Sequence, residues 1–383
     1  MQTQTILTPA KPKLKGQVKF VNASKDKNAF FGTLKKRVDA YFIETGRSKY
    51  ANQTLVIKTV VLLLVYIVPF VLLLAFTPPL ALSLLLWFVM GVGMAGLGMS
   101  VMHDANHGAY SSNKALNYIM AHVLNLLGGS TVNWKLQHNI LHHTYTNVTH
   151  MDDDIEDKLM LRFSPHTKVK KVHKYQWLYS FFFYGLSTFY WIVAKDFVQY
   201  VKFKKNGVNA SSDAENRIML AKIILLKVVY FSILFVVPSV FFGIPFYQLL
   251  LGFLVMHFVA GIILTVIFQL AHSVEGTAHP MPNEAGIIEN DWAIHQLNTT
   301  VNFSRRNKWL SWYVGGLNFQ VEHHLFPRIS HVHYPALSSI VKSTAEEFGI
   351  PYLENETFGI ALRSHIEFLK RLGKLPDLDE AIG

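Results

Sequence analysis

Four apolar runs, each long enough to cross a lipid bilayer, constrain the fold of this chain more than any other feature. A transmembrane helix needs about 20 apolar residues, and these runs lie at about residues 55–76, 80–102, 218–242 and 247–270. Hydrophobic residues make up 51% of the chain, which is more than ordinary soluble enzymes carry. The sequence therefore predicts an all-α integral membrane protein with four transmembrane helices.

The four runs come in two pairs, and the charges between them predict an orientation. Very short, uncharged connections, TPP at residues 77–79 and GIPF at residues 243–246, join the members of each pair. The long segments outside the pairs carry Lys and Arg, and the net charge of the chain is +11. By the positive-inside rule, we expect both termini and the large middle loop to lie in the cytoplasm.

Two further apolar segments, residues 115–130 and 175–194, are interpreted as helices at the cytoplasmic surface. The first is short for a span, and the second is rich in aromatic residues, which suit the membrane interface. If only one of them crossed the bilayer, the last pair of spans would be inverted. The polar, basic N-terminus has no closely following apolar run, so we do not expect a cleavable signal peptide.

Histidine is the most informative residue type outside the spans. The chain has 18 histidines and no cysteine, so disulfides, thiolate metal sites and cysteine nucleophiles are excluded. Seven histidines fall in three short motifs, HDANH, HNILHH and QVEHH, and an eighth ends the fourth apolar run. These motifs and that run supply His103, His107, His138, His142, His143, Gln320, His323, His324 and His272.

These eight histidines are predicted to form one metal centre. Residues four apart share a helix face, and all eight are expected at the same side of the membrane. A tetrahedral structural zinc needs only four ligands, so eight fit two metal ions better. Imidazole suits iron, copper and zinc, so ligand type leaves the metal open. Ordinary surface or core roles are expected for His122, His150, His166, His173, His257, His279, His331, His333 and His365.

The three motifs resemble the histidine boxes of the integral-membrane fatty acid desaturases, H-x(3-4)-H, H-x(2-3)-H-H and (H/Q)-x-x-H-H, in that order. Residues 103–113, 137–157 and 315–337 also look like the corresponding stretches of the family. The resemblance covers about residues 55–345 and implies a desaturase domain there, between cytoplasmic segments at 1–54 and 346–383. Gln320 in the third box resembles the front-end branch, which includes Δ5, Δ6 and linoleoyl-CoA desaturases.

By this resemblance, the eight histidines would ligate two iron ions, and Gln320 would bind weakly or indirectly. The reaction implied is an O2-dependent dehydrogenation that leaves a cis double bond in a fatty acyl chain held in a narrow apolar tunnel. Many front-end relatives carry a fused cytochrome b5 domain with an H-P-G-G stretch, which this sequence lacks. We therefore expect a separate cytochrome b5 or ferredoxin, docked on the basic cytoplasmic face.

Several other polar residues are candidates for roles around the metal centre. Carboxylates that could orient ligand histidines are Asp104, Asp152, Asp153, Asp154 and Glu322. The acidic run at 151–157 also fits a solvated loop or helix cap. His295, Gln296 and Asn302 could line the end of the site that binds the head group, or could serve packing. Trp134 and Trp292 are interpreted as anchors at the membrane interface.

The sequence is also compatible with other functions. A hydroxylase or ketolase of the same superfamily would have similar motifs and would differ in the oxygen content of its product. A metal transporter would need ligands near the bilayer midplane, whereas these histidines lie past the span ends. A haem protein would be recognised by its absorption spectrum. The position of the double bond and the acyl carrier, CoA, phospholipid or carrier protein, are not predicted.

Overall fold

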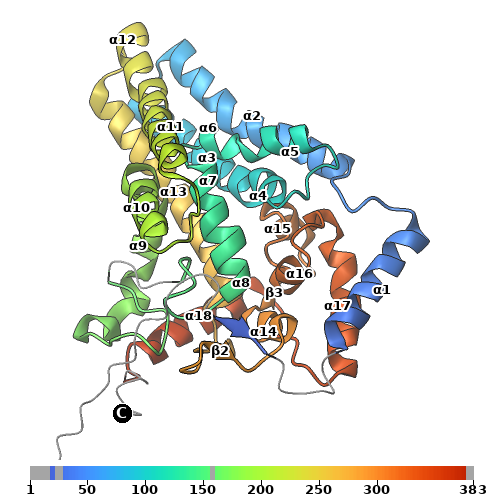
Figure 1. The fold of residues 1–383 in the computed structure, drawn as a ribbon. Helices are drawn as coiled ribbons and strands as arrows, with labels where there is room; N and C mark the ends of the chain where they lie inside the picture. The colour runs from blue at the N-terminus through green and yellow to red at the C-terminus, as the bar shows by residue number, and fades with distance from the viewer. Residues whose placement is uncertain (1–17, 22–28, 156–159, 377–383) are drawn as a thin grey trace, which may run out of the picture.

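The computed structural model describes residues 18–21, 29–155 and 160–376, and Figure 1 shows a helical protein whose long helices extend away from a cap of shorter elements. Within this described part, four helices are long and apolar enough to cross a membrane, which confirms the predicted four spans. They are α2 (Gln53–Phe76), α3 (Leu80–Gly96) continued by α4 (Met102–Asn106), α11 (Asp213–Phe231) continued by α12 (Val237–Phe242), and α13 (Phe246–His272).

Two spans contain a π-helical turn and begin or end outside their apolar runs. Residues 97–101 join α3 to α4, and residues 232–236 join α11 to α12. The third span begins at Asp213, before the apolar run, because Ser212 and Glu215 form a capping box that starts the helix in polar sequence. The second span continues past its apolar run as far as Asn106, so His103 lies on a helix.

The predicted surface helices form, with different bounds. The first segment contains α5 (Lys114–Ala121) and α6 (Val123–Leu126). The second forms α9 (Gln176–Tyr190), which continues through a π-helical turn into α10 (Asp196–Lys205). Neither segment is among the four candidate spans in the described residues. Their placement at the cytoplasmic surface stays a prediction.

Helix α9 packs closely against α13, and glycines permit the approach. A Cβ atom added to Gly261 would lie 2.6 Å from the carbonyl oxygen of Gly185. Gly91 of α3 is similarly close to α13, since its added Cβ would lie 2.6 Å from the carbonyl oxygen of Met256. Small residues at such crossings are typical of helix packing in membranes. Helices α3, α9 and α13 therefore form one tightly packed unit.

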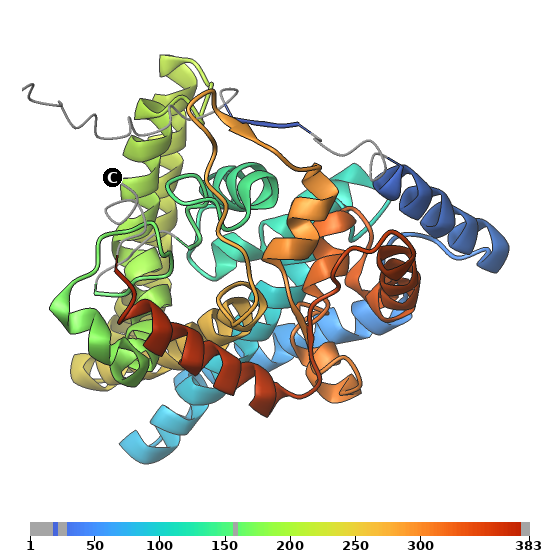
Figure 2. The same ribbon diagram turned by 90° about the horizontal axis from the view of Figure 1, so that it is seen from below.

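The remaining elements form the cap, on the side of the molecule seen from below in Figure 2. Apolar residues of α1 (Phe30–Thr45), α14 (Trp292–Thr299), α16 (Gln320–Leu325) and α17 (Tyr334–Glu347) form its core, among them Phe30, Leu34 and Leu337. Two short parallel strand pairs join distant segments: β1 (Lys19–Phe20) with β2 (Ile287–Ile288), and β3 (Asn302–Phe303) with β4 (Glu354–Asn355). The other helices of the cap are α7 (Thr131–Trp134), α8 (His143–Tyr145), α15 (Lys308–Tyr313) and α18 (Phe358–Leu372).

The predicted fold class is confirmed: the protein is mostly helical, with four candidate spans and clustered histidines. The expected domain boundary at residue 345 falls within α17. Beyond it, β4 pairs with β3, and α18 packs against α9 and α13. Residues after 345 are thus joined to the main body by backbone hydrogen bonds and by packing.

Candidate metal centre

Four segments deliver the predicted histidines to one place. His103 lies in α4 and His107 directly follows it, His138 and His142 lie on a π-helical segment (Lys135–His142), and His143 begins α8. His272 is the last residue of α13, and α16 carries Gln320, His323 and His324. The centre therefore lies at the junction between the spans and the cap.

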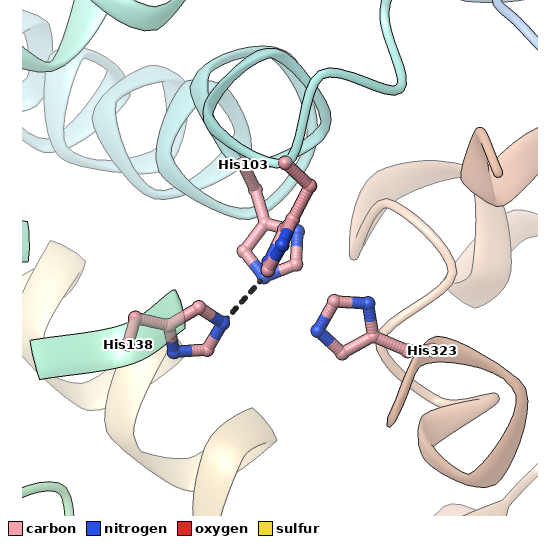
Figure 3. Close-up of side chains that lie close together, drawn as sticks. His103, His138 and His323 are labelled. Atoms are coloured by element: carbon pink, nitrogen blue, oxygen red, sulfur yellow. Dashed lines mark hydrogen bonds between the residues drawn. The ribbon is translucent and has the colours of Figure 1, made fainter. Parts of the chain in front are cut away.

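The rings point toward one another across these segments. Figure 3 shows His103, His138 and His323 reaching a common space from three different elements. Nε2 of His138 lies 3.1 Å from Nε2 of His103 and 3.3 Å from Nε2 of His143. Two nitrogens that bind the same metal ion, each at about 2.1 Å, lie a similar distance apart.

A π-helical turn in the second motif brings His138 and His143 together. The backbone N–H of His143 donates to the carbonyl oxygen of His138, a bond between residues five apart. The α-helical spacing in the sequence predicts the pair His138 and His142 instead. Both pairs are in contact, since the ring centroids of His138 and His142 are 5.1 Å apart and stacked.

The ligand atoms fall into groups that suit two ions. Nitrogens of His103, His107, His138 and His323 lie within 4.8 Å of one another, and those of His142, His272 and His324 form a second such group. A third group, His143 with His323 and His324, lies between them because it shares a residue with each. All of these side chains are buried except His107, which is partly buried.

The hydrogen bonding and the protonation state of the imidazoles fit a metal site. Nε2 of His107, His142 and His323 is buried without a hydrogen-bond partner in the described structure, and such orphan atoms are rare in native proteins. Burial lowers the pKa of His107, His143, His323 and His324 well below the usual value, so the rings are neutral. A neutral imidazole with a free lone pair is the form that ligates metals.

Hydrogen bonds on the far side of the rings fix their orientation. Nδ1 of His142 lies 2.9 Å from Oδ2 of Asp152, and Nδ1 of His324 lies 2.8 Å from Oε1 of Gln296. A ligand histidine commonly donates its second N–H to such a partner, which leaves Nε2 for the metal. Nδ1 is likewise oriented in His138, His272 and His323, by Asp154 at 3.4 Å, the carbonyl oxygen of Thr299 at 3.3 Å and the hydroxyl of Tyr334 at 3.1 Å.

Asp152 also changes the proton affinity of its partner. Burial opposes the charged form of His142, but the carboxylate charge and the hydrogen bond of Asp152, together with the charge of Asp154, outweigh it and raise the pKa of His142. An imidazole with a higher proton affinity is also the stronger electron donor to a metal. Asp152 therefore both orients His142 and strengthens it as a ligand.

Three of the predicted carboxylates contact other parts of the structure. Asp104 accepts hydrogen bonds from Ser330 and from the backbone of His331. Asp153 accepts from Gln199 at 2.7 Å and pairs with Lys202 at 2.5 Å. Oε1 and Oε2 of Glu322 accept from Tyr352 and Asn302, and burial raises the pKa of Glu322 to about 7.

The three candidates for head-group binding lie inside the cap. His295 is buried, its ring centroid is 4.9 Å from that of Phe20, and burial lowers its pKa to about 4. Gln296 holds His324, and Asn302 joins Glu322 to Tyr352. None of these three residues is among the described residues that line the cavity beside the centre.

The interpretation of Trp134 as an interfacial anchor is wrong, because it is 8% exposed and its ring stacks on His138 at a centroid distance of 4.4 Å. The indole N–H of Trp292 donates to the carbonyl oxygen of His143 at 3.2 Å. Both tryptophans therefore support the second histidine motif. A tryptophan four residues before His138 lies on the same helical face, which is the one sequence signal for this contact.

A cavity of about 700 Å³ opens beside the centre, and the residues that line it include an apolar set and a polar set from different elements. His103, His138 and Gln320 contribute to its wall at the centre. The part called here the deep half runs between the spans and α9, and its lining includes Met94, Gly98, Met99, Phe183, Ser187, Thr188, Leu264, Thr265, Phe268 and Gln269. The other part, called the polar end, is lined by Gln137, Asp153, Asp154, Lys195, Gln199 and Lys202.

Fold and centre together define a membrane protein with groups of buried histidines that could hold metal ions beside a largely apolar cavity. The family model described as fatty acid desaturase matches residues 80–355. The chain belongs to the fatty acid desaturase family, as the three histidine motifs predict, and the predicted desaturase class of enzyme is confirmed.

The relatives also match the predicted front-end branch. The sn-1 linoleoyl-lipid 6-desaturase of Synechocystis sp. is 35% identical over 350 residues, which are 91% of this chain and 96% of that protein. The protein of the same name from Arthrospira platensis is 33% identical, over 90% of this chain and 92% of its own length. The acyl-lipid (8-3)-desaturase of Physcomitrium patens is 33% identical, over 92% of this chain and 73% of its own length.

Proposed function

We propose that this chain uses O2 and two iron ions to introduce a cis double bond into an unsaturated acyl chain of a membrane lipid, on the carboxyl side of an existing double bond. The observation that carries the proposal is the pair of buried histidine groups, the first of which contributes His103 and His138 to the wall of a largely apolar cavity. Similarity to relatives named as acyl-lipid desaturases supports lipid as the carrier, and the names of the first two support C6 as the position.

Each histidine group would hold one iron. His103, His107, His138 and His323 would bind the first, His142, His272 and His324 the second, and His143 lies between them. Gln320 is near the second group, since its Nε2 lies 2.8 Å from Nε2 of His272. Oε1 of Gln320 is buried without a partner in the described structure, which supports a weak or indirect contact with the metal. Bound iron would supply the activation of O2 needed to remove hydrogen from an unactivated methylene.

The protein would hold the acyl chain so that one pair of carbons faces the centre. The deep half would take the methyl end, and the polar end would take the ester and head group, where Lys195, Gln199 and Lys202 lie. Position along this cavity would then determine which carbons lose hydrogen. Two hydrogens leave the chain, two electrons and two protons come from outside, and O2 is reduced to two waters.

The electrons would come from a separate cytochrome b5 or ferredoxin. The net charge of +11 supports attraction of an acidic donor. The charge distribution around the four spans supports cytoplasmic termini and a cytoplasmic centre. The donor and the centre would then be on the same side of the membrane.

Product analysis tests this proposal. The chain would be expressed in a host with a suitable donor, C16 to C20 substrates supplied, and the fatty acids analysed by mass spectrometry. The expected product has one more double bond on the carboxyl side of an existing one, and His138→Ala abolishes it. An unchanged profile with iron-loaded protein would falsify the proposal. Products that gain oxygen would instead identify a hydroxylase or ketolase.

A further inference from the structure

The deep half of the cavity is apolar except for a few polar side chains, and one of them has an atom without a partner. Gln269 is 3% exposed and lines the cavity, and its Oε1 has no hydrogen-bond partner in the described structure. Ser187 and Thr265 also line the cavity, and their hydroxyls lie 2.8 Å apart. A buried amide oxygen left unpaired is costly, so contacts within the protein do not explain Oε1 of Gln269.

These groups lie along the part of the cavity that runs from the metal centre into the spans. Thr265 and Gln269 are four residues apart on α13, and so they share a face of the helix. Gln269 precedes His272 by three residues, so it lies roughly 5 Å from it along the axis, and Thr265 lies roughly 10 Å away. On α3, Met94 is about 13 Å from His103 by the same measure. The amide and the hydroxyl pair thus follow the centre in order along the deep half.

A front-end desaturase must accept a chain that already holds a cis double bond beyond the reacting carbons. If the head group occupies the polar end, that double bond lies in the deep half, next to Gln269. The vinylic C–H groups of a cis double bond are weak hydrogen-bond donors that an amide oxygen such as Oε1 of Gln269 accepts, and the π face of the alkene accepts a weak hydrogen bond from an amide N–H or a hydroxyl; a saturated methylene chain offers neither to the same degree. A saturated chain would leave these polar groups facing hydrocarbon, at a cost in binding.

We infer that Gln269, with the hydroxyl pair of Ser187 and Thr265 one turn further along, recognises the existing cis double bond and gives the enzyme its preference for unsaturated chains. This inference rests on the proposed function. Gln269 acts here as a specificity determinant and leaves hydrogen removal itself to the metal centre. Each weak contact accounts for a preference of roughly two- to fivefold.

Substrate competition with Gln269→Leu tests the inference. The full chain is expressed with its donor, and linoleate is supplied together with stearate and with oleate. The ratio of linoleate conversion to conversion of each competitor is expected to fall roughly two- to fivefold, while the iron content is unchanged. Gln248→Leu is the matched control, since Gln248 lies at the other end of α13 and donates to the carbonyl oxygen of Pro78. The control is expected to keep the ratio.

A binding measurement keeps the test valid if Gln269→Leu lowers overall activity. A fluorescent conjugated polyene fatty acid is bound to the purified protein and displaced by linoleate or by stearate. Gln269→Leu, and separately Thr265→Val with Ser187→Ala, should reduce the advantage of linoleate over stearate. An unchanged advantage in both variants overturns the inference, and so does a loss of iron in Gln269→Leu, which would place the amide in the metal site. Absence of any conversion by the unsubstituted chain would overturn the proposed function itself.

Discussion

Lys58 Nζ lies 2.8 Å from Nε2 of His331, and both side chains are buried although Lys58 belongs to a span and His331 to the cap. Nδ1 of His331 is in turn 3.0 Å from Oδ2 of Asp104, which also accepts a hydrogen bond from Ser330 at 2.7 Å. Asp104 neighbours His103 in the first motif, and Ser330 follows the third. This network therefore fixes two of the three histidine motifs relative to each other and to α2.

Replacing Asp104 by Ala should destabilise the protein strongly, because it leaves the buried Lys58 and His331 without their acidic partner. Removing the carboxylate of this buried network leaves the charge of Lys58 without a counter-charge, which costs about 3–5 kcal/mol. Thermal unfolding in detergent measures the loss. The control is Asp39→Ala, which removes an exposed pair with Lys49 and should cost less than about 1 kcal/mol. Equal, small losses in both variants would mean that the network does not hold the motifs together.

Asp152→Asn should weaken iron binding at the second histidine group. The carboxylate orients His142, and loss of such a partner typically lowers metal affinity about 10- to 100-fold. Iron retention during titration with a chelator measures the effect. Asp153→Asn is the matched control because Asp153 bonds Gln199 and Lys202. If both variants lose iron equally, the effect comes from the loop as a whole and the orienting role of Asp152 is wrong.

Gly261→Ala should separate α9 from α13. The added methyl would lie 2.6 Å from one backbone oxygen and 2.7 Å from another, and backbone atoms cannot move aside cheaply. Overpacking of this kind costs about 1–3 kcal/mol. Gly359→Ala, where an added Cβ meets nothing within 4 Å, should leave the unfolding temperature within a degree or two of the unsubstituted protein. A Gly261→Ala protein with unchanged stability would show that the two helices are further apart.

His365 should make the protein less stable on the acid side. Burial lowers the pKa of His365 to about 4, while its Nδ1 lies 2.6 Å from the carbonyl oxygen of Ser273. An unfolded histidine has a pKa of about 6.5, so between pH 6.5 and 4 the unfolded chain binds a proton that the folded chain does not. The free energy of unfolding therefore carries no penalty from His365 above pH 6.5. Below pH 6.5 it falls, by up to about 1.4 kcal/mol per pH unit.

His365→Gln should flatten this dependence of the unfolding temperature between pH 6.5 and 4. His122→Gln serves as the control, because His122 is partly exposed and hydrogen bonds only locally, to the carbonyl oxygen of Tyr118. The expected result is a shallower acid slope for the first variant alone. A slope identical to that of the unsubstituted protein would mean that His365 is protonated in the folded state.

The sequence predicts the spans and the histidine motifs because both depend on local patterns. Runs of apolar residues define α2 and α13 directly, and the spacing of His103 and His107 is visible in five letters. The observed bounds of a helix differ from the predicted ones where the helix extends into polar sequence. The third span is an example, because the capping box at Ser212 starts it before the apolar run. The π-helical turn that brings His143 to His138 has no comparable pattern, since the same letters also suit an α-helix.

Contacts between distant segments are the part that local patterns do not contain. Gln296 holds His324, and Tyr334 contacts His323, because packing in the cap brings α14 and α17 to α16. Asp104 lies inside the first motif, yet its partners are Ser330 and His331, more than 220 residues further along. The residue type alone indicates that such a side chain needs a hydrogen-bond partner, and only the fold shows which residue that partner is.

Metal analysis of the purified chain is the most decisive test of the two-iron centre. Protein produced with iron and zinc both present would be assayed for each metal per chain, alongside a His272→Ala variant. We expect about two irons per chain, and about one in the variant, because His272 belongs to one histidine group and not to the other. A single metal ion per chain, or zinc in place of iron, would contradict a two-iron centre built from these eight histidines.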